Sequence, residues 1–519
     1  MRKLMRFLSA MAILLSHQAI ATPLGFTYEH IWTNTTTAND PEGGSEIVAY
    51  DKTSEQVFIT NSSEDTLDVL DARTGTKLGS IALGGGPNSV AVKNGIVAVA
   101  IEASNKTDPG TVKIFNASDA LSSPVLNSIH VGSLPDMLSF TADGKKIIVA
   151  NEGEAKNGVN PNGSVSIIDI SSGISSATIE HSEFSAYNGQ EAALRAQGVR
   201  LFPGINASQD LEPEYIALSK DGTKAYVTLQ ENNSLAIIDL NNPNNTPDIV
   251  SFGTKDHGLS GQGLDASDKD SIKQVNTFAK LSGMYMPDTI ASYNVNGKDY
   301  LVTANEGDAR DEDKRVSKLN LDPTAFPNAA ALQEKESLGR LQVSSIDGDI
   351  DNDGDFDQLF SYGTRSFSIW DDVGNLVWDS GDFIEQLLID QFPGLWAVGR
   401  EDNKGPEPEG VALLNIVDHW IAFVGLERSS AILAFDITDP NSPFYIDLIA
   451  NAGDISPEGM LTVTSEDSLD GESYLLVANE VSGTTSLYRV SIPEPGSIIL
   501  LLFGLLLLHH RLKSRVHFK

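Results

Sequence analysis

The stretch PDMLSFTADGKKIIVANEGEAKNGVNPNGSVSIIDI, residues 135–170, contains the unit that decides the fold. It opens with a proline and an acidic residue, which an apolar strand-like run follows. A turn leads to a second apolar run that ends in Asn151-Glu152. A third run, of the type Ser-apolar-x-apolar-apolar-Asp, closes the unit at Asp169. Short apolar runs bounded by Asp-Gly or Asn-Gly turns are typical of antiparallel strands.

The same unit recurs along the chain with a period of roughly 45 residues. Self-similarity at this period, with about four strands per unit, predicts an all-β fold of the β-propeller type. We count seven units and therefore predict seven blades, although six or eight remain open because long insertions blur the period. The units begin at Glu46, Pro87-Asn88, Pro135-Asp136, Pro213-Glu214, Pro287-Asp288, Pro408-Glu409 and Pro457-Glu458.

Three long insertions interrupt the repeat, at residues 253–283, 306–341 and 373–404. Two of them contain helix-like patterns, over residues 267–281 and 383–391, and the first has acidic residues in its first turn. Loops of this length are usually functional or form caps. We expect the insertions to carry short helices and to cover one face of the propeller.

Acidic residues repeat at two positions of the unit, after the proline and after the asparagine. Equivalent positions of successive blades fall on a ring around the propeller axis, so the sequence predicts an acidic central channel that attracts divalent cations. The alternative is that these residues cap backbone amides in the turns. The ring residues are Asp136, Glu152, Glu214, Glu231, Asp288, Glu306, Glu409, Glu427, Glu458 and Glu480.

A second acidic pattern lies in residues 347–357, DGDIDNDGDFD. Its spacing matches the first half of an EF-hand loop, but position 12 is Phe360 rather than glutamate and no flanking helices are apparent. The segment resembles the Asp-rich calcium loops found outside that fold. We predict a structural calcium site, against the alternative of a solvated acidic loop, with the ligands Asp349, Asp351, Asp353, Asp355 and Asp357.

Two arginines stand beside acidic residues in a chain poor in arginine. Arg310 follows Asn305-Glu306-Gly307-Asp308, and Arg365 lies in Gly363-Thr364-Arg365-Ser366. An arginine next to carboxylates and a metal could orient a phosphate or carboxylate ligand. An internal salt bridge is the simpler interpretation of either one.

The two ends of the chain predict its location. Residues 1–21 have a basic start, an apolar core and the small-residue site Ala19-Ile20-Ala21, as in a secretory signal peptide. Residues 493–519 contain Pro493-Glu494-Pro495, a short apolar run and a basic end. They resemble the PEP-CTERM sorting signal, which implies processing by an exosortase-type membrane peptidase after transient membrane anchoring. A plain C-terminal anchor is the alternative, and residues 22–492 are the propeller domain in either case.

The composition limits the classes of partner. The chain has 71 acidic and 36 basic residues, and the basic residues of the two ends make the middle more acidic still. This charge argues against nucleic acid as a partner. The chain has no cysteine, so thiolate catalysis and disulfides are excluded. It also has no Gly-x-Ser-x-Gly, Walker or His-Glu-x-x-His motif.

The middle of the chain resembles the choice-of-anchor I family of exported, YVTN-like propeller proteins. The matching stretches are 286–291, 304–310, 363–371, 408–410 and 457–459. The resemblance implies a seven-bladed propeller, and some members carry alkaline phosphatase or phytase-like labels.

Two hypotheses about function follow. The first is a non-catalytic, calcium-binding surface or matrix protein of a Gram-negative cell envelope that binds extracellular polysaccharide or another envelope protein. The second is a calcium-dependent phosphohydrolase with the candidate residues Glu306, Asp308, Arg310, Arg365 and Glu409.

Overall fold

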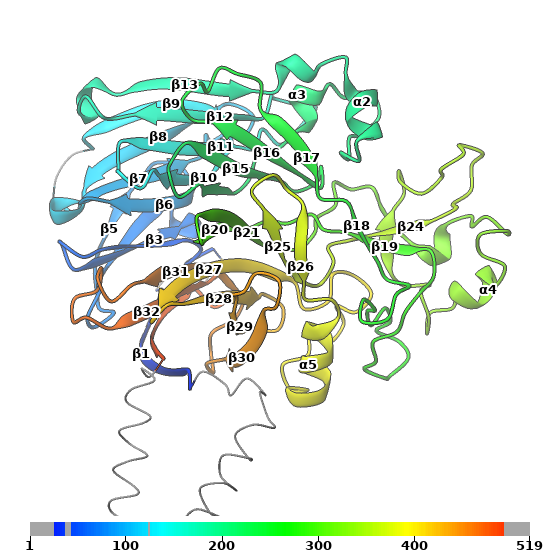
Figure 1. The fold of residues 1–519 in the computed structure, drawn as a ribbon. Coiled ribbons are helices and arrows are strands. Elements are labelled where there is room, and N and C mark those ends of the chain that lie inside the picture. Colours follow the sequence, from blue (N-terminus) through cyan, green and yellow to red (C-terminus); the bar gives the residue numbers. More distant parts are fainter. Residues whose placement is uncertain (1–24, 37–42, 123–124, 493–519) are drawn as a thin grey trace, which may run out of the picture.

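The computed structural model describes residues 25–36, 43–122 and 125–492, which form eight β-sheets (Figure 1). Seven of the sheets have four antiparallel strands each, and the eighth has five strands. The first three sheets are β2 (Val48–Asp51), β3 (Gln56–Asn61), β4 (Thr66–Asp71) and β5 (Lys77–Ala82); β6 (Pro87–Lys93), β7 (Ile96–Ile101), β8 (Pro109–Asn116) and β9 (Asn127–Ser133); and β10 (Pro135–Phe140), β11 (Lys146–Asn151), β12 (Ser164–Asp169) and β13 (Thr178–Glu183).

The remaining four-stranded sheets follow the same order along the chain, except that the last one recruits an early strand. They are β14 (Ile216–Leu218), β15 (Lys224–Leu229), β16 (Ser234–Asp239) and β17 (Asp248–Ser251); β20 (Ile290–Val295), β21 (Lys298–Ala304), β25 (Phe367–Asp371) and β26 (Leu376–Asp379); β27 (Pro408–Ile416), β28 (His419–Leu426), β29 (Ala431–Asp436) and β30 (Phe444–Ile449); and β31 (Pro457–Val463), β32 (Ser473–Asn479), β33 (Thr484–Ser491) and β1 (Thr27–Thr35).

The first strand of each four-stranded sheet contacts the first strand of the next sheet. The contacts run from β2 through β6, β10, β14, β20, β27 and β31 and return to β2. Buried apolar side chains fill the space between neighbouring sheets, for example Ile148 and Val165 against Val227 and Ala236. A closed circuit of sheets packed face to face is the arrangement of a β-propeller, as the repeat predicts.

The aspartate that closes most of the units has a local structural role. Asp71 Oδ1 accepts hydrogen bonds from the amides of Arg73 and Thr74, at 3.1 and 2.9 Å. Asp169 and Asp239 do the same for the amide two residues on, at 2.8 and 2.9 Å. Aspartate is suited to this turn because its short side chain reaches the backbone two residues ahead. The repeated aspartate therefore ends the third strand and starts the turn to the fourth.

The first two insertions, with the residues up to 362, form a lobe that projects from one side of the propeller (Figure 1). Its sheet has the order β18 (Thr254–Asp256), β19 (Leu281–Met284), β24 (Leu359–Tyr362), β23 (Gln342–Ser344) and β22 (Asp313–Arg315), and β19 and β24 are parallel. The lobe has its own apolar core, which includes Leu281, Leu319 and Leu341. We refer below to residues 253–284 and 306–362 as the lobe.

Four short helices are present in the described part of the chain: α2 (Glu191–Ala196), α3 (Ala207–Asp210), α4 (Ala329–Leu332) and α5 (Phe383–Gln391). The helix predicted at 383–391 is confirmed. The helix predicted at 267–281 is wrong, because Asp265 Oδ2 accepts the Gln274 amide at 3.0 Å and Leu264 forms a bridge with Asn276, which closes the segment into a loop. In the described residues, no helix is long and apolar enough to cross a membrane. The predicted signal peptide and sorting tail lie outside those residues.

Candidate functional site

The acidic positions after the repeated proline converge on the propeller axis. In the seven four-stranded sheets, the equivalent residues lie at, or two residues before, the start of the first strand. A cavity of about 180 Å³ is lined by Asn88, Asp136, Asp288, Glu409 and Glu458, and Met137 and Tyr215 also contribute to its wall. We call this the central cavity. Below, the ring means only the seven equivalent positions at the first strands: Glu46, Asn88, Asp136, Glu214, Asp288, Glu409 and Glu458. The other predicted ring members follow second strands instead: Glu152, Glu231, Glu306, Glu427 and Glu480.

The glycine after the acidic residue explains how neighbouring first strands approach so closely. A Cβ atom on Gly459 would lie 2.0 Å from the Glu46 carbonyl oxygen. A Cβ atom on Gly410 would lie 2.3 Å from the carbonyl oxygen of Glu458. These distances leave room for no side chain other than hydrogen. The Pro-Glu-Gly repeat thus packs the backbones together and places one glutamate from each strand at the cavity.

The carboxyl groups of the ring are poorly solvated. Burial raises the pKa of Asp136 to about 7, and it raises the pKa of Glu46 to about 7 as well. Burial, followed by repulsion from neighbouring carboxylates, also raises the pKa values of Glu214, Asp288 and Glu458 well above their usual range. A cation in the cavity would oppose both effects, since it favours the charged form.

The asparagine of the repeated Asn-Glu pair is structural. Asn151 is fully buried and donates to Ser164 O and Ser166 Oγ, at 3.1 and 2.9 Å, while its Oδ1 accepts from the Gly132 amide at 3.0 Å. Asn305 makes the equivalent bonds, since its Nδ2 donates to Ser366 Oγ and Ser368 Oγ at 3.3 and 2.8 Å. The bonds hold the second strand of a sheet to the third. The asparagine therefore joins two strands of its sheet.

Glu306 lies where the lobe meets the ring. Its Oε1 pairs with Lys404 Nζ, and its Oε2 accepts from Gln230 Nε2 at 3.1 Å. Lys404 Nζ is also 3.6 Å from Glu407 Oε2 and 3.9 Å from Asp308 Oδ1. Glu306 and Glu409 both line the central cavity, whereas Asp308 lies beside a second cavity of about 190 Å³ with Lys404.

Three cations already surround Glu407. Burial alone would raise the pKa of this carboxyl, but Lys404, Arg400 and Arg428 hold the pKa below its usual range. Arg400 Nε donates to Glu407 Oε1 at 2.8 Å, and Arg428 Nε donates to Oε2 at 3.2 Å. The oxygens of Glu306, Glu407 and Glu427 lie within 4.8 Å of one another. A metal there would compete with these tethered cations.

Arg310 is enclosed by carboxylates. Its Nη1 is 2.5 Å from Asp210 Oδ1, and its Nη2 pairs with Glu212 and lies 3.7 Å from Glu231 Oε2. The guanidinium also stacks on the Phe202 ring at 4.8 Å. Burial raises the pKa of Glu212 to about 9, to which the Glu231 charge contributes and which Arg310 opposes. The internal salt bridge considered for Arg310 is what the structure contains.

Arg365 serves the fold in a different place. It is 5% exposed, and its Nη1 donates to Glu385 Oε1 at 2.7 Å and to the Asp265 carbonyl oxygen at 2.5 Å. Its Nη2 donates to the carbonyl oxygens of Glu401 and Asn403, at 2.6 and 2.9 Å. Arg365 therefore ties α5 and the 373–404 insertion to the lobe. The structure does not bring Arg365 and Arg310 to a common ligand.

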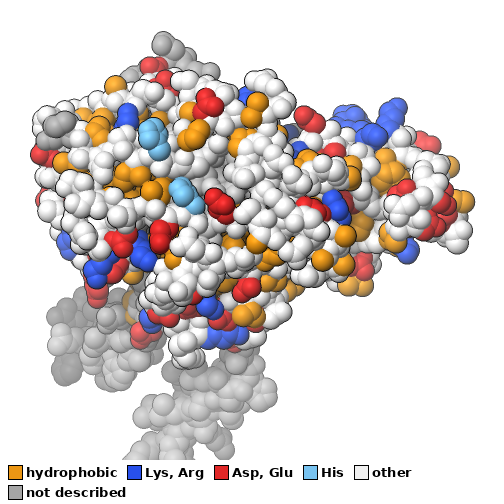
Figure 2. All heavy atoms as spheres, turned by 90° about the horizontal axis from the view of Figure 1, so that it is seen from above, with side chains coloured by type: hydrophobic (Ala, Val, Ile, Leu, Met, Phe, Trp, Pro, Cys, Tyr) orange, Lys and Arg blue, Asp and Glu red, His pale blue; other side chains and the backbone are white. Residues whose placement is uncertain are grey.

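The five predicted calcium ligands fall into two groups in the lobe. Oxygens of Asp349, Asp351 and Asp353 lie within 4.8 Å of one another, and those of Asp355 and Asp357 form a second such group with Asp322. The Leu321–Phe356 bridge brings Asp322 beside the loop. Removal from water, followed by the charge of Asp353, raises the pKa of Asp351. Figure 2 shows acidic side chains gathered at the far end of the lobe.

Sequence reasoning missed several residues of these clusters. The most important are Asp210, Glu212, Asp322, Lys404 and Glu407. Three basic residues lie beside Glu306 and Glu407, next to the central cavity: Lys404, Arg400 and Arg428. The signal available was weak: a Lys-Gly-Pro-Glu run directly before the sixth repeat, at residues 404–407.

Four-stranded sheets in a closed circuit around an acidic cavity define an all-β propeller protein. The chain belongs to the choice-of-anchor I family, because residues 46–440 match the Choice-of-anchor I domain. Similar solved structures include Hydrazine Synthase of Kuenenia stuttgartiensis, with a TM-score of 0.45, 13% identity and coverage of 88% of this chain and 99% of that chain. Another is the Cps50 (Swd1) β-propeller domain of Myceliophteria thermophila, with a TM-score of 0.46, 8% identity and coverage of 90% and 100%.

Two curated proteins are similar in sequence. The "Mesenchyme-specific cell surface glycoprotein" of Strongylocentrotus purpuratus is 29% identical over 335 residues, which are 54% of this chain and 41% of that protein. "Gigasin-3a" of Magallana gigas is 28% identical over 191 residues, which are 31% of this chain and 67% of that protein. The chain thus spans less than half of the length of the first relative.

Proposed function

We propose that this protein is an exported, calcium-binding β-propeller that acts at the cell surface or in the extracellular matrix as a non-catalytic binding module. The observation that carries the proposal is the pair of aspartate groups in the lobe. Hard carboxylate oxygens in a short loop around a glycine are the donor set that Ca²⁺ prefers. A bound ion would relieve the repulsion among these carboxylates and stiffen the lobe.

The loop backbone supports this assignment. The Asp353 amide donates to Asp349 Oδ1 and the Gly354 amide donates to Asp349 Oδ2, both at 3.1 Å. The Ile350 amide donates to Asp357 Oδ2 at 2.9 Å. These bonds curl the loop and hold the carboxylates of Asp349 and Asp357 against its backbone. Calcium would hold Asp349, Asp351, Asp353, Asp355 and Asp357, and Asp322 would complete the second group.

We infer seven blades. Support comes from the seven four-stranded sheets and from the circuit of contacts among their first strands, in which the five-stranded sheet takes no part. The five-stranded sheet has a parallel strand pair and a core of its own, so it is better described as an inserted lobe than as a blade.

Export and anchoring rest on the chain ends and on the family. The expected signal peptide would direct export, and the expected tail would be processed by an exosortase-type peptidase after transient membrane anchoring. The partner at the surface would be extracellular polysaccharide or another envelope protein of a Gram-negative bacterium. Similarity to a protein named as a cell surface glycoprotein supports the location. Cell fractionation of a strain with Pro493-Glu494-Pro495 replaced by alanines tests it, and an unchanged distribution would contradict the anchoring step.

A calcium-dependent phosphohydrolase is the second candidate, supported by the ring carboxylates beside Glu306. Arg310 and Arg365 both use their guanidinium groups for bonds within the protein, so neither offers two free N–H donors to a phosphate. This favours the binding module. Turnover of a generic phosphomonoester between pH 6 and 10 in saturating calcium would favour the enzyme, and its absence would eliminate this candidate.

The calcium site is tested by isothermal titration of purified protein with CaCl₂. The unmodified protein is expected to bind calcium and to melt at a higher temperature with it. The D349N/D351N/D353N variant is expected to lose at least one site and most of the thermal gain. The matched control is E334Q/E336Q, which changes exposed acids of the same lobe outside both groups. Equal binding by both variants would overturn the loop as the calcium site.

A further inference from the structure

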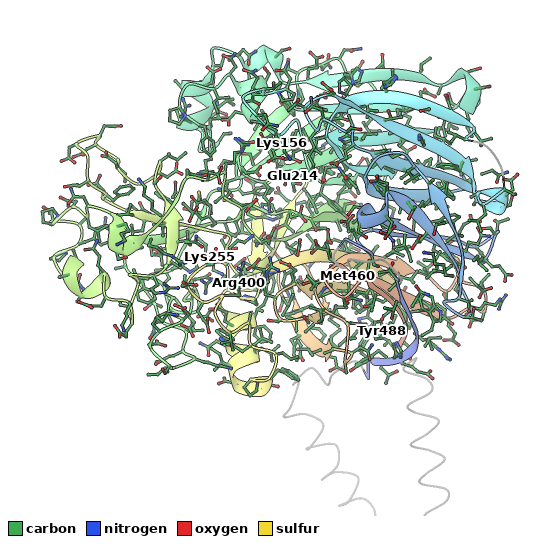
Figure 3. All side chains as sticks on the ribbon, turned by 180° about the vertical axis from the view of Figure 1, so that it is seen from behind. Lys156, Glu214, Lys255, Arg400, Met460 and Tyr488 are labelled. Carbon is green, nitrogen blue, oxygen red and sulfur yellow. The ribbon has the colours of Figure 1, made fainter. Side chains whose placement is uncertain are left out.

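The central cavity has a feature that the lobe sites lack, which is buried carboxylate oxygens without partners. Oε2 of Glu409 and of Glu458, which line the cavity, and Oε2 of Glu214, which lies at the equivalent position two residues before β14, are buried and have no hydrogen-bond partner among the described residues. The Glu214 side chain is the clearest case, because the residue is only 6% exposed. Its carboxylate lies within electrostatic reach of those of Asp136 and Asp288 on the flanking strands. Glu214 and Met460 are labelled in Figure 3.

The ring also lacks a counter-charge in direct contact. Among the described lysines and arginines, none lies within 4.0 Å of a carboxylate oxygen of Glu46, Asp136, Glu214, Asp288, Glu409 or Glu458, whereas Glu306 and Glu407 next to the cavity have Lys404, Arg400 and Arg428. Buried polar groups in native proteins normally have partners. Six acidic side chains at equivalent positions, with several unpartnered oxygens, therefore point to a ligand that the chain does not itself provide.

We propose that the central cavity binds a divalent cation that keeps part of its hydration shell, held by the carboxylates of the ring. The donor set is entirely oxygen, which suits Mg²⁺ or Ca²⁺ rather than a softer metal. The ring carboxylates are too widely spaced for several of them to touch one ion directly. Among the described residues, no group of three acidic side chains with oxygens within 4.8 Å of one another contains any of these six. Waters must therefore bridge the ion to the ring.

The volume is sufficient for a hydrated ion. The cavity of about 180 Å³ is large enough for several waters, each of which takes about 30 Å³ in the liquid. Asn88 completes the ring at the seventh position, but its Nδ2 donates to the Pro135 carbonyl oxygen at 3.1 Å. Its amide oxygen is the atom left to accept a hydrogen bond from a water in the cavity. The cation site is thus separate from the calcium groups of the lobe and does not depend on them.

The test uses MgCl₂ and CaCl₂ as probes on the full chain, by isothermal titration and by melting temperature. The critical variant is E214Q/E409Q, which keeps the shape of the ring and removes two charges. We expect the number of bound cations to fall by one relative to the unmodified protein, or the affinity of that site to fall at least tenfold. In the presence of a chelator, the variant should melt at a higher temperature than the unmodified protein, because two buried charges are gone.

The second arm separates the cavity from the lobe. In a D349N/D351N/D353N/D355N/D357N background, one cation should remain bound, and E214Q/E409Q should remove it. If this background does not fold, the comparison of unmodified protein with E214Q/E409Q decides alone. Unchanged stoichiometry and affinity in E214Q/E409Q, with either probe, would overturn the proposal.

Discussion

Replacement of Arg310 by methionine is expected to lower the free energy of unfolding by about 3–5 kcal/mol. In the folded protein, Arg310 is the cation shared by Asp210, Glu212 and Glu231. Asp210 and Glu212 are almost fully buried, so water replaces little of the lost attraction. The prediction separates a structural role of Arg310 from a ligand-binding role.

The magnitude follows from the charges. At an effective dielectric constant of about 20, two unit charges 4 Å apart interact by about 4 kcal/mol. In the unmodified protein, attraction to Arg310 offsets the cost of burying the carboxylates. Without the arginine, that cost and the repulsion among the carboxylates remain. Protonation of Glu212 limits the loss, which is why the total is comparable with the cost of breaking one buried ion pair rather than several.

The assay is guanidinium denaturation followed by tryptophan fluorescence, with an exposed pair as control. Arg73 pairs with Glu55, and their side chains are 53% and 46% exposed, so R73M is expected to leave the free energy of unfolding almost unchanged. R310M/E212Q should recover part of the loss of R310M, because it removes one of the unpaired charges. A loss in R310M as small as that in R73M would refute the structural role. A phosphate-binding role would instead leave stability unchanged and abolish phosphate binding.

Two further predictions concern the ring. Gly459→Ala is expected to lower the free energy of unfolding by about 3 kcal/mol, since the new Cβ would lie 2.0 Å from the Glu46 carbonyl oxygen. Gly394→Ala is the control, because its Cβ would meet no atom within 4 Å, and it should be nearly neutral in the same denaturation assay. In chelator, the melting temperature should fall as the pH rises from about 4 to about 7 and then level off, because Asp136, with a folded-state pKa of about 7, keeps a proton that the unfolded chain loses near pH 4. One such group accounts for up to about 4 kcal/mol, so D136N should show a shallower fall, and an identical slope would contradict the assignment.

The sequence predicts the propeller well because its determinants are local. The aspartate that ends most third strands binds amides two residues away. A Pro-acid pair lies at or just before most first strands, and β27 and β31 begin with Pro-Glu-Gly. Equivalent positions then meet on the axis by symmetry, which is why a shared acidic cavity could be predicted without coordinates. Five of the ten predicted residues line it: Asp136, Asp288, Glu306, Glu409 and Glu458. The buried asparagine was harder to interpret, since its partners are on the next strand.

The clusters around the ring could not be predicted, because they join segments far apart in the chain. Glu306 and Lys404 are separated by 98 residues, and Arg310 and Asp210 by 100. Nothing in either local pattern indicates the other. The loop at 267–281 failed as a helix for a related reason, because Asp268 pairs with Arg340 of a distant segment rather than with the start of a helix.

The pairing of β1 with β33 has a mechanical consequence. Thr27 lies opposite Ser491, so the first and last described strands of the propeller leave it at neighbouring points of one sheet. A pull applied at residue 492 would load β33, which has a full ladder on each side, to β1 and to β32. The load would be shared between two rows of hydrogen bonds. Tension on a C-terminal tether would therefore reach the other blades and the lobe only after the hydrogen bonds of β33 to both β1 and β32 had broken.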